Sequence, residues 1–431
     1  MIQTGGNGSW DTIASLLQDI RPPRMARVRQ RFVHPAPVDV ASEIKRQFAQ
    51  MDLLSQVRPG QTVAITVGSR GIANQILAVR TLVELLKGAG AEPFIVPAMG
   101  SHAGATAEGQ RDMLLGMGYT PEATGAPIHS SMETVELDRT AEGLPVLVDQ
   151  NAYQADWLIV MNRIKPHVCF RGPYESGLMK MITIGLGKQK GASIAHNLGF
   201  GYMSRHIPEI AKAALPHLRM LCAVGFVENA YHETAICRVL RKEEIETEEP
   251  KLLEQARSFA ARLHFDKLDT LIIDEIGKNI SGSGFDTNVV GRYHSPCISG
   301  GPSITRLLIL DIAKQSKGNG NGLGMADFTT RRAAEKFDFV QTYPNTLTAT
   351  LTGGVKIPMV LPNDLQGVQS CLKTANLPDP QAATVVRIHN TLCLDEIEVS
   401  ETLLPFIQGD DRFEQLSEPC DMPFDSNGNL F

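Results

Sequence analysis

The chain has 431 residues, 43% of them hydrophobic and 20% charged, and its 41 basic and 47 acidic side chains give a net charge of -6 at pH 7. This composition is typical of a folded globular protein and excludes a fibrous, disordered or membrane-embedded chain. The negative balance argues against a general nucleic-acid binder and against binding to an anionic membrane. A chain of this length predicts two or three domains.

The cysteines and the N-terminus predict a cytoplasmic protein. Seven cysteines are present and no two of them form a Cys-x-x-Cys pair, which favours reduced thiols over a disulfide framework or a cysteine zinc site. Residues 1–30 contain no apolar core of a signal peptide, and the longest apolar runs are far shorter than the ~20 residues that a membrane-spanning helix needs. Nothing in the sequence indicates an oligomeric state.

The N-terminal half alternates strand and helix patterns. After ~55 residues that are irregular and then partly helical (40–51), a strand is predicted over 61–66, a helix over 73–87 and a second strand over 93–97. Thr106 can cap a helix that runs to residue 117, with Glu108 in its first turn. Further strands are predicted over 145–148 and 157–161. This alternation indicates parallel βαβ units.

A second α/β domain is predicted to follow a charged connector. The run Arg-Lys-Glu-Glu-Ile-Glu-Thr-Glu-Glu at 241–249 is interpreted as solvated, and Pro250 as the start of a helix. Strands are predicted over 270–273, 306–310, 359–361 and 385–388, and residues 317–324 as a flexible glycine-rich loop. We therefore expect two α/β domains with mostly parallel sheets flanked by helices. They comprise 1–255, with 405–431 as a candidate addition, and 256–404, and the active site is expected in the cleft between them.

Basic side chains follow three predicted strands of the N-terminal half, at the point where each strand ends. The first is followed by Ser69 and Arg70, the second by His102, and the strand at 157–161 by His167. Because the carboxyl ends of parallel strands meet at one edge of a sheet, where ligands bind, these side chains predict a shared site. A single histidine after a strand is more often structural, but three such strand ends favour a site.

Glycine-rich segments follow these residues. Residues 171–192 contain Lys180, Lys188 and Lys190, and the last two are candidates to bind a phosphate, with a glycine-stabilised loop as the alternative. Neither a Walker motif nor a dinucleotide fingerprint is present. In the second half, Lys278 and Arg292 flank a glycine-rich loop that is predicted to bind an anion or face the cleft, and a surface role is the alternative for Lys278.

At these residues the sequence resembles the lactate racemase family, whose members use a nickel-pincer nucleotide. Gly100-Ser101-His102 with Thr106 and Glu108 is similar to the family stretch Gly-Ser/Thr-His-Arg-x-x-Thr-x-Glu. Pro166-His167 is followed by a glycine-rich segment that ends in Lys180, and His196 follows at the spacing that the family uses. Val67 and Ala103 stand where the family has Asp and Arg, so this is a divergent member.

The resemblance implies a racemase or epimerase of a 2-hydroxy acid that works by hydride transfer, because removing the C2 proton would leave a carbanion beside a carboxylate. It implies that His102 and His167 are the two acid–base groups, one for each enantiomer. His196 would ligate nickel and Lys180 would bond to the cofactor. Arg70 would bind the substrate carboxylate, and we take Lys278, which matches no family motif, as the candidate second-domain cation that completes this carboxylate site. Ser69, Ser176, Lys188 and Lys190 would contact the cofactor, and the enzymes that assemble that cofactor would be partners.

Three alternatives remain open. A zinc or iron hydrolase would use His102, His167 and His196, although no His-x-x-x-His or His-Glu-x-x-His spacing occurs. A non-catalytic protein would sequester a nucleotide or a hydroxy acid. An ordinary nicotinamide-dependent dehydrogenase is disfavoured by the missing fingerprint. Arg163 and Arg171 near His167 indicate a larger or more anionic substrate than lactate, such as a sugar acid or a dicarboxylate, with surface ion pairs as the alternative.

Overall fold

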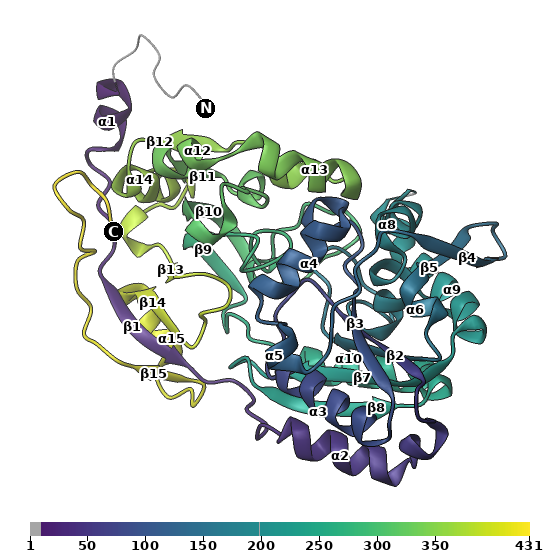
Figure 1. The fold of residues 1–431 in the computed structure, drawn as a ribbon. Coiled ribbons are helices and arrows are strands. Elements are labelled where there is room, and N and C mark those ends of the chain that lie inside the picture. Colours follow the sequence, from purple (N-terminus) through teal and green to yellow (C-terminus); the bar gives the residue numbers. More distant parts are fainter. Residues whose placement is uncertain (1–9, 198) are drawn as a thin grey trace. The chain divides into compact units, whose positions relative to one another are not determined.

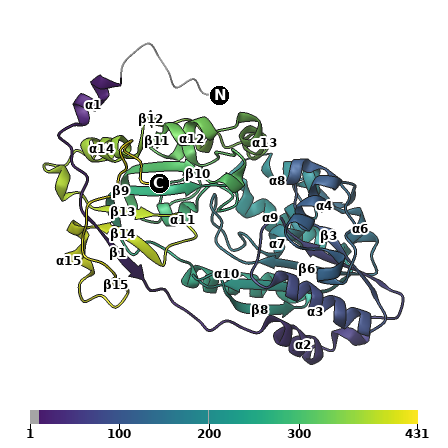
Figure 2. The same cartoon turned by 60° about the vertical axis from the view of Figure 1, so that its left-hand side comes forward.

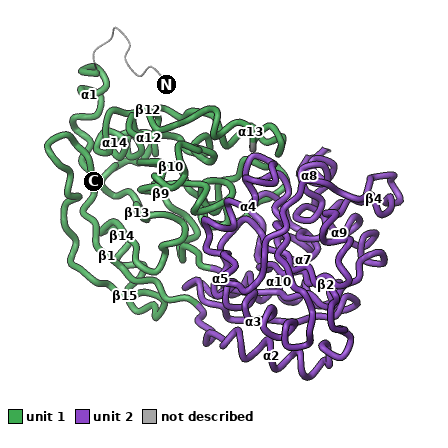
Figure 3. Tube along the Cα trace, in the orientation of Figure 1, with its two compact units in different colours: residues 1–32, 261–431 green, residues 33–260 purple. Residues whose placement is uncertain are grey.

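The computed structural model describes residues 10–197 and 199–431. The chain forms two compact units, one of residues 33–260 and the other of residues 1–32 with 261–431 (Figure 3). Both combine helices with sheets, so the predicted α/β class is confirmed (Figure 1). Among the described residues, no helix has the length and apolar character needed to cross a bilayer.

The unit of residues 33–260 is built on a five-stranded sheet in the order β3-β2-β6-β7-β8. The first four strands are parallel and β8 runs antiparallel to β7. Strands β4 and β5 form a separate antiparallel pair. The elements of the unit are α2 (Val40–Gln50), β2 (Thr62–Val67), α3 (Gln75–Gly88), β3 (Glu92–Pro97), α4 (Ala107–Gly116), α5 (Pro121–Thr124), β4 (Thr134–Arg139), β5 (Pro145–Asp149), α6 (Gln150–Gln154), β6 (Trp157–Arg163), α7 (Leu178–Lys180), the π-helical turn η3 (Met181–Gly185), α8 (Lys188–His196), α9 (Met203–Ala214), β7 (Met220–Glu228), β8 (Thr234–Leu240) and α10 (Ile245–Phe259).

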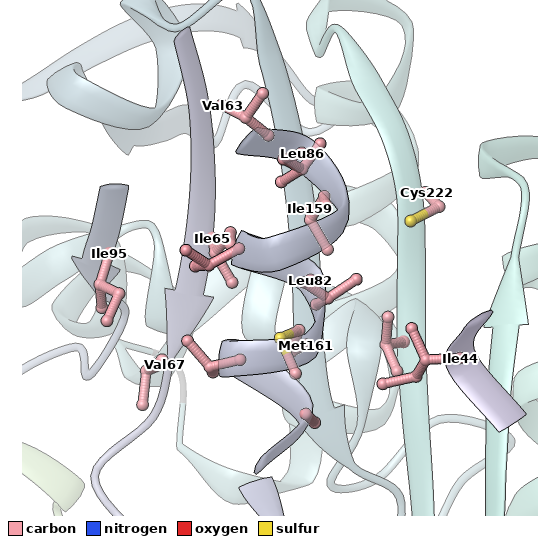
Figure 4. Packing of buried hydrophobic residues seen from close by; sticks show 14 of the residues in the cluster. Ile44, Val63, Ile65, Val67, Leu82, Leu86, Ile95, Ile159, Met161 and Cys222 are labelled. Carbon is pink, nitrogen blue, oxygen red and sulfur yellow. The ribbon is translucent and has the colours of Figure 1, made fainter. Parts of the chain in front are cut away.

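The core of this unit follows the two periods of its elements. Alternate residues of β2, such as Ile65 and Val67, face helix α3, whose Leu82 and Leu86 lie one turn apart (Figure 4). Ile44 of α2 closes the same cluster. The opposite face of the sheet contacts α7 and α10. The sheet is therefore covered on both sides, as its mostly parallel strands require.

The other unit is built on an eight-stranded sheet in the order β12-β11-β10-β9-β13-β14-β1-β15. The strands from β12 to β13 are parallel, and β14, β1 and β15 continue the sheet antiparallel. Its elements are α1 (Asp11–Leu17), β1 (Met25–Gln30), β9 (Lys267–Ile276), α11 (Thr287–Val290), β10 (Ser303–Ile312), β11 (Phe328–Thr330), α12 (Arg331–Lys336), α13 (Phe339–Ala349), β12 (Met359–Leu361), α14 (Asp364–Thr374), β13 (Val385–Ile388), β14 (Glu396–Ser400), α15 (Leu404–Ile407) and β15 (Phe413–Gln415).

The terminal segments lie in a different unit from the predicted one. The change of unit at 260 falls close to the predicted boundary at 255, but β1 pairs with β14 and with β15 (Figure 2). Backbone hydrogen bonds therefore place residues 25–30 and 413–415 together in the unit of residues 261–431, rather than with residues 33–260. The predicted strands and the helices at 40–51, 73–87 and 106–117 are confirmed, with Thr106 accepting the Gly109 N–H at 3.0 Å.

The charged run at 241–249 is not a solvated connector. Helix α10 begins inside it at Ile245, and Pro250 lies within the helix rather than at its start. Ile245 and Glu249 are buried because the helix turns them toward the sheet, while Lys251 is exposed. The charge pattern alone did not reveal which face of the helix is buried.

Candidate active site

A cavity of about 160 Å³ lies where β2, β3 and β6 end, entirely within the unit of residues 33–260. It brings together five of the predicted site residues from separate parts of the sequence. Its lining comprises Gly68, Ser69, Arg70, Ile72, Ala98, Met99, His102, Asn162, Arg163, Lys165, Ser176, Lys180, Met181, Ile184 and Gly185. The position agrees with the rule that open parallel sheets bind ligands beyond the carboxyl ends of their strands.

Ser69 and His102 are joined across the ends of β2 and β3. The Ser69 Oγ lies 2.5 Å from His102 Nδ1, so this ring nitrogen is held by the serine. The turn after His102 is strained, because Ala103 and Ala105 adopt left-handed backbone angles of φ +55° and +54° on either side of Gly104. This strain sits directly beside a side chain of the cavity.

The cavity is strongly basic. Arg70, Arg163, Lys165 and Lys180 line it, and no Asp or Glu belongs to the lining residues that the structure describes. Arg163 forms an ion pair with Glu228. Arg70 has no carboxylate partner within the described chain and donates only to the Ser69 carbonyl at 3.1 Å. Burial and the charge of Arg163 lower the pKa of Arg70, so an anion in this cavity would be strongly favoured.

Lys180 ends helix α7 and faces the cavity. It is half-buried, and with the residues described it makes no side-chain hydrogen bond and no ion pair. Burial, reinforced by the charges of Lys165 and Arg70, lowers the pKa of its ammonium to about 8, although Cys169 and Glu175 act in the opposite direction. The π-helical turn η3 follows immediately, and such turns are frequent at functional sites.

His167 lies beside Lys180, outside the cavity lining. Burial, followed by the charges of Lys180 and Lys165, holds the pKa of His167 well below its ordinary value, so its ring is neutral. Its Nδ1 accepts the Cys169 N–H at 3.1 Å, and its backbone N–H donates to Glu175 at 2.6 Å.

His196 is the last residue of helix α8. Its Nδ1 lies 2.7 Å from the Ala192 carbonyl, and because a carbonyl only accepts, Nδ1 carries the proton and Nε2 keeps its lone pair. Burial lowers the pKa of His196, with Lys180 as a smaller cause that acts in the same direction. His196 and His167 both approach the ring of Phe200, with centroid distances of 5.3 and 6.2 Å. The imidazole is therefore oriented as a single nitrogen ligand would be.

Lys188 does not contact the cavity, contrary to the prediction of a cofactor contact. Its side chain is completely buried at the start of α8, and its ammonium lies 3.0 Å from Asp149, 3.2 Å from the Gln110 side-chain oxygen and 2.5 Å from the Pro97 carbonyl. Gln110 in turn donates to the Gly100 carbonyl at 2.9 Å. Through Gln110, Lys188 thus helps to hold the turn that carries His102. Lys190 is exposed and does not line the cavity.

Lys278 and Arg292 belong to the other unit. The Lys278 ammonium donates to the Gly282 carbonyl at 2.9 Å, and its proposed contact with the substrate stays a prediction. Arg292 pairs with Asp327 at 2.8 Å and donates to two backbone carbonyls of strand β10 at 3.0 Å. Its loop was predicted to bind an anion, but the guanidinium is occupied by protein groups.

Three residues that sequence reasoning missed hold the site from behind. Glu175 and Glu249 are fully buried carboxyl groups that accept backbone N–H groups of the segments carrying His167 and Lys180. Arg257 of α10 donates to Glu175 at 2.6 Å. Glu249 could have been found from its position in α10, where it falls on the same helical face as the apolar residues. The acidic residues around it in the sequence made it look exposed.

Comparisons with known proteins agree with this architecture. Residues 18–206 match the family model of the lactate racemase N-terminal domain. The fold is similar to that of the lactate racemase apoprotein from Thermoanaerobacterium thermosaccharolyticum, with a TM-score of 0.52 and 14% identity over 85% of this chain and 94% of that one. The comparison with curated proteins finds no match.

The fold and the site define a two-unit α/β protein with a basic cavity at the strand ends of its first unit. Residues 18–206 match the lactate racemase N-terminal domain, and the chain as a whole shares its fold with a lactate racemase.

Proposed function

We propose that this chain is a racemase or epimerase that inverts C2 of a 2-hydroxy acid and depends on the nickel-pincer nucleotide. The observation that carries the proposal is Lys180, a cavity lysine that has no ion-pair partner among the described residues and stands with Arg70 and His102 in one basic cavity. An amine with a lowered pKa is the form of lysine that bonds covalently to an acyl group. The match of residues 18–206 to the lactate racemase N-terminal domain supports the reaction class.

The residues present fit the nucleotide. Its anionic groups would be held by the cations of the cavity, and Lys180 would bond to it. No group of three or more His, Cys, Asp or Glu side chains in the described parts of the chain is placed to hold a metal by itself. One ligand, His196 through Nε2, is what a cofactor with its own chelating atoms requires, whereas a zinc or iron hydrolase requires several.

The nucleotide, when bound, supplies the acceptor for the hydride that leaves C2. Arg70 binds the substrate carboxylate, which a planar guanidinium does with two parallel hydrogen bonds. His102 exchanges the hydroxyl proton through Nε2, while Ser69 holds Nδ1. His167 performs the same task for the opposite enantiomer. An anion beside Lys180 cancels part of the positive field on His167, so its pKa returns toward the range in which a histidine exchanges protons.

The basic lining of the cavity, apart from the ion-paired Arg163, supports a substrate with more negative charge than lactate, such as a sugar acid or a dicarboxylate. The test uses single enantiomers of several such acids labelled with deuterium at C2 and the chain loaded with cofactor. Formation of the opposite epimer with deuterium kept at C2 is the expected result, because the hydride returns to the same carbon. Exchange of that deuterium with solvent would indicate proton abstraction, and binding without turnover would indicate a sequestering protein.

A further inference from the structure

Helix α10 reaches both chain segments that carry the proposed site residues. It packs against β7 and against α7, on the opposite face of the sheet from α2 and α3. Two of its side chains, Glu249 and Arg257, are directed to the residues from 167 to 180. Neither of them lines the cavity.

Glu249 holds the segment of Lys180. Its Oε2 accepts the Met179 N–H at 3.0 Å, one residue before the lysine. Gly177 is in close contact with the same carboxyl, since a Cβ at that position would lie 1.9 Å from Glu249 Oε1. Asn162 fixes the Gly177 carbonyl from the other side at 2.8 Å. The backbone that precedes Lys180 is therefore held by hydrogen bonds to two side chains, Glu249 and Asn162.

The Glu249 carboxyl is an unusual anchor. Only 1% of the residue is exposed, and Oε1 finds no hydrogen-bond partner within the described residues. Burial raises its pKa to about 8, so the group is neutral at physiological pH. A buried polar group without full satisfaction costs stability, and an apolar side chain would avoid that cost. Its presence calls for a role other than stability.

Arg257 holds the segment of His167 through Glu175. Its guanidinium donates to Glu175 Oε1 at 2.6 Å. The other oxygen of that buried carboxyl accepts the His167 N–H at 2.6 Å, and Oε1 also accepts the Gly172 N–H at 3.1 Å. The shorter of the two ion pairs of Glu175 is thus the one with Arg257, since Arg171 lies 3.5 Å from the other oxygen, and the carboxylate in turn fixes the backbone of the histidine.

We propose that α10 is the positioning element of the cavity, with Glu249 fixing Lys180 and Arg257, through Glu175, fixing His167. The catalytic meaning of this inference rests on the proposed function, because that function assigns the tasks of Lys180 and His167. The geometric part does not, since the contacts belong to the chain alone. Catalysis depends on holding such groups to within a fraction of an ångström, which requires a rigid support behind them.

The test measures the reactivity of the Lys180 amine in the chain without cofactor. An amine-selective acylating reagent is applied over a range of pH, and the modification of Lys180 is followed by peptide mass spectrometry. In the wild-type chain the rate is expected to reach half its maximum at pH about 8. Glu249→Ala releases the segment, so the amine reaches water and its pKa rises, which slows modification at neutral pH about tenfold.

Matched variants separate positioning from general stability. Glu249→Gln keeps an acceptor for the Met179 N–H and is expected to retain the wild-type rate profile. Lys251→Gln, on the exposed side of the same helix, removes only a surface ion pair with Glu248 and is expected to change nothing. A folded Glu249→Ala chain with the wild-type profile would overturn the proposal.

A second variant covers the case in which Glu249→Ala does not fold. Gly177→Ala pushes a methyl group against the carboxyl from the other side and is expected to slow Lys180 modification in the same way. The contact between Arg257 and Glu175 is tested separately. Arg257→Met releases the segment of His167, so the imidazole is less buried and its pKa is expected to rise in an NMR titration. Arg257→Lys is expected to bring this pKa partly back to the wild-type value. An unmoved titration in Arg257→Met would overturn that part of the proposal. Failure of these tests leaves the racemisation test unaffected, and a failed racemisation test leaves the contacts of α10 standing.

Discussion

Two lysines eight residues apart show how differently one residue type is used in this molecule. Lys188 is fully buried, yet Asp149, Gln110 and the Pro97 carbonyl surround its ammonium. Lys180 is only half-buried, yet no ion-pair partner is found for it in the described chain. Satisfaction by neighbours, rather than depth, therefore distinguishes a structural cation from one that awaits a ligand. Both lie in the glycine-rich stretch that predicted the site.

The largest change in the free energy of unfolding is expected at Lys188, whose ammonium has partners in the protein. Lys188→Met leaves Asp149 in the interior without its cation, and breaking a buried pair in this way costs about 3–5 kcal/mol. Urea unfolding at neutral pH measures the change, with Lys190→Met as the exposed control that is expected to stay within about 0.5 kcal/mol of the wild type. A loss under about 1 kcal/mol in Lys188→Met would remove the distinction between the two lysines.

At Lys180, which has no ion-pair partner among the described residues, substitution is expected to change the free energy of unfolding in the opposite direction. Lys180→Met removes a cation that burial disfavours, so the cofactor-free chain should gain up to about 3 kcal/mol at pH 7 and lose racemisation. The gain has a pH signature. Because the pKa of Lys180 falls from 10.5 to about 8 on folding, the wild-type chain gains stability as pH rises between these values.

The advantage of Lys180→Met should therefore shrink over that alkaline range, as urea unfolding at several pH values would show. A destabilised Lys180→Met chain would mean that the ammonium is held by groups of the protein after all.

A smaller effect is expected where the cavity is supported by one hydrogen bond. Ser69→Ala frees His102 Nδ1, and losing such a bond costs about 1 kcal/mol, so kcat/KM for racemisation should fall about fivefold to tenfold. The pH profile should move as well, because the His102 ring loses its hydrogen bond at Nδ1. Ser69→Thr keeps the hydroxyl and should restore both, whereas equal activity in Ser69→Ala would show that the contact does not position the histidine.

The sequence predicted local structure well and long-range pairing poorly. The strands that carry Arg70, His102 and His167 were found because their apolar runs end in turn residues, and parallel sheets bring such ends together. The pairing of β1 with β14 and β15 joins segments that are far apart in the chain, and no local pattern records it.

The site was predicted in part for the same reason. Arg70 and His102 lie in one cavity because each follows a predicted strand, whereas Lys180, which ends a short helix that was not predicted, was named only through the family resemblance. Lys188 was predicted to contact the cofactor, because its partner Asp149 lies on a strand far from it in sequence. Glu249 looked like one more solvated acid, because the helical face that buries it depends on the sheet behind it.

The most direct test of the central claim is the intact mass and nickel content of the chain after co-expression with the enzymes that assemble the cofactor. We expect a mass increase located on Lys180 and about one nickel per chain, with both lost in Lys180→Met and both kept in Lys190→Met. A wild-type chain that carries neither the added mass nor nickel would contradict it.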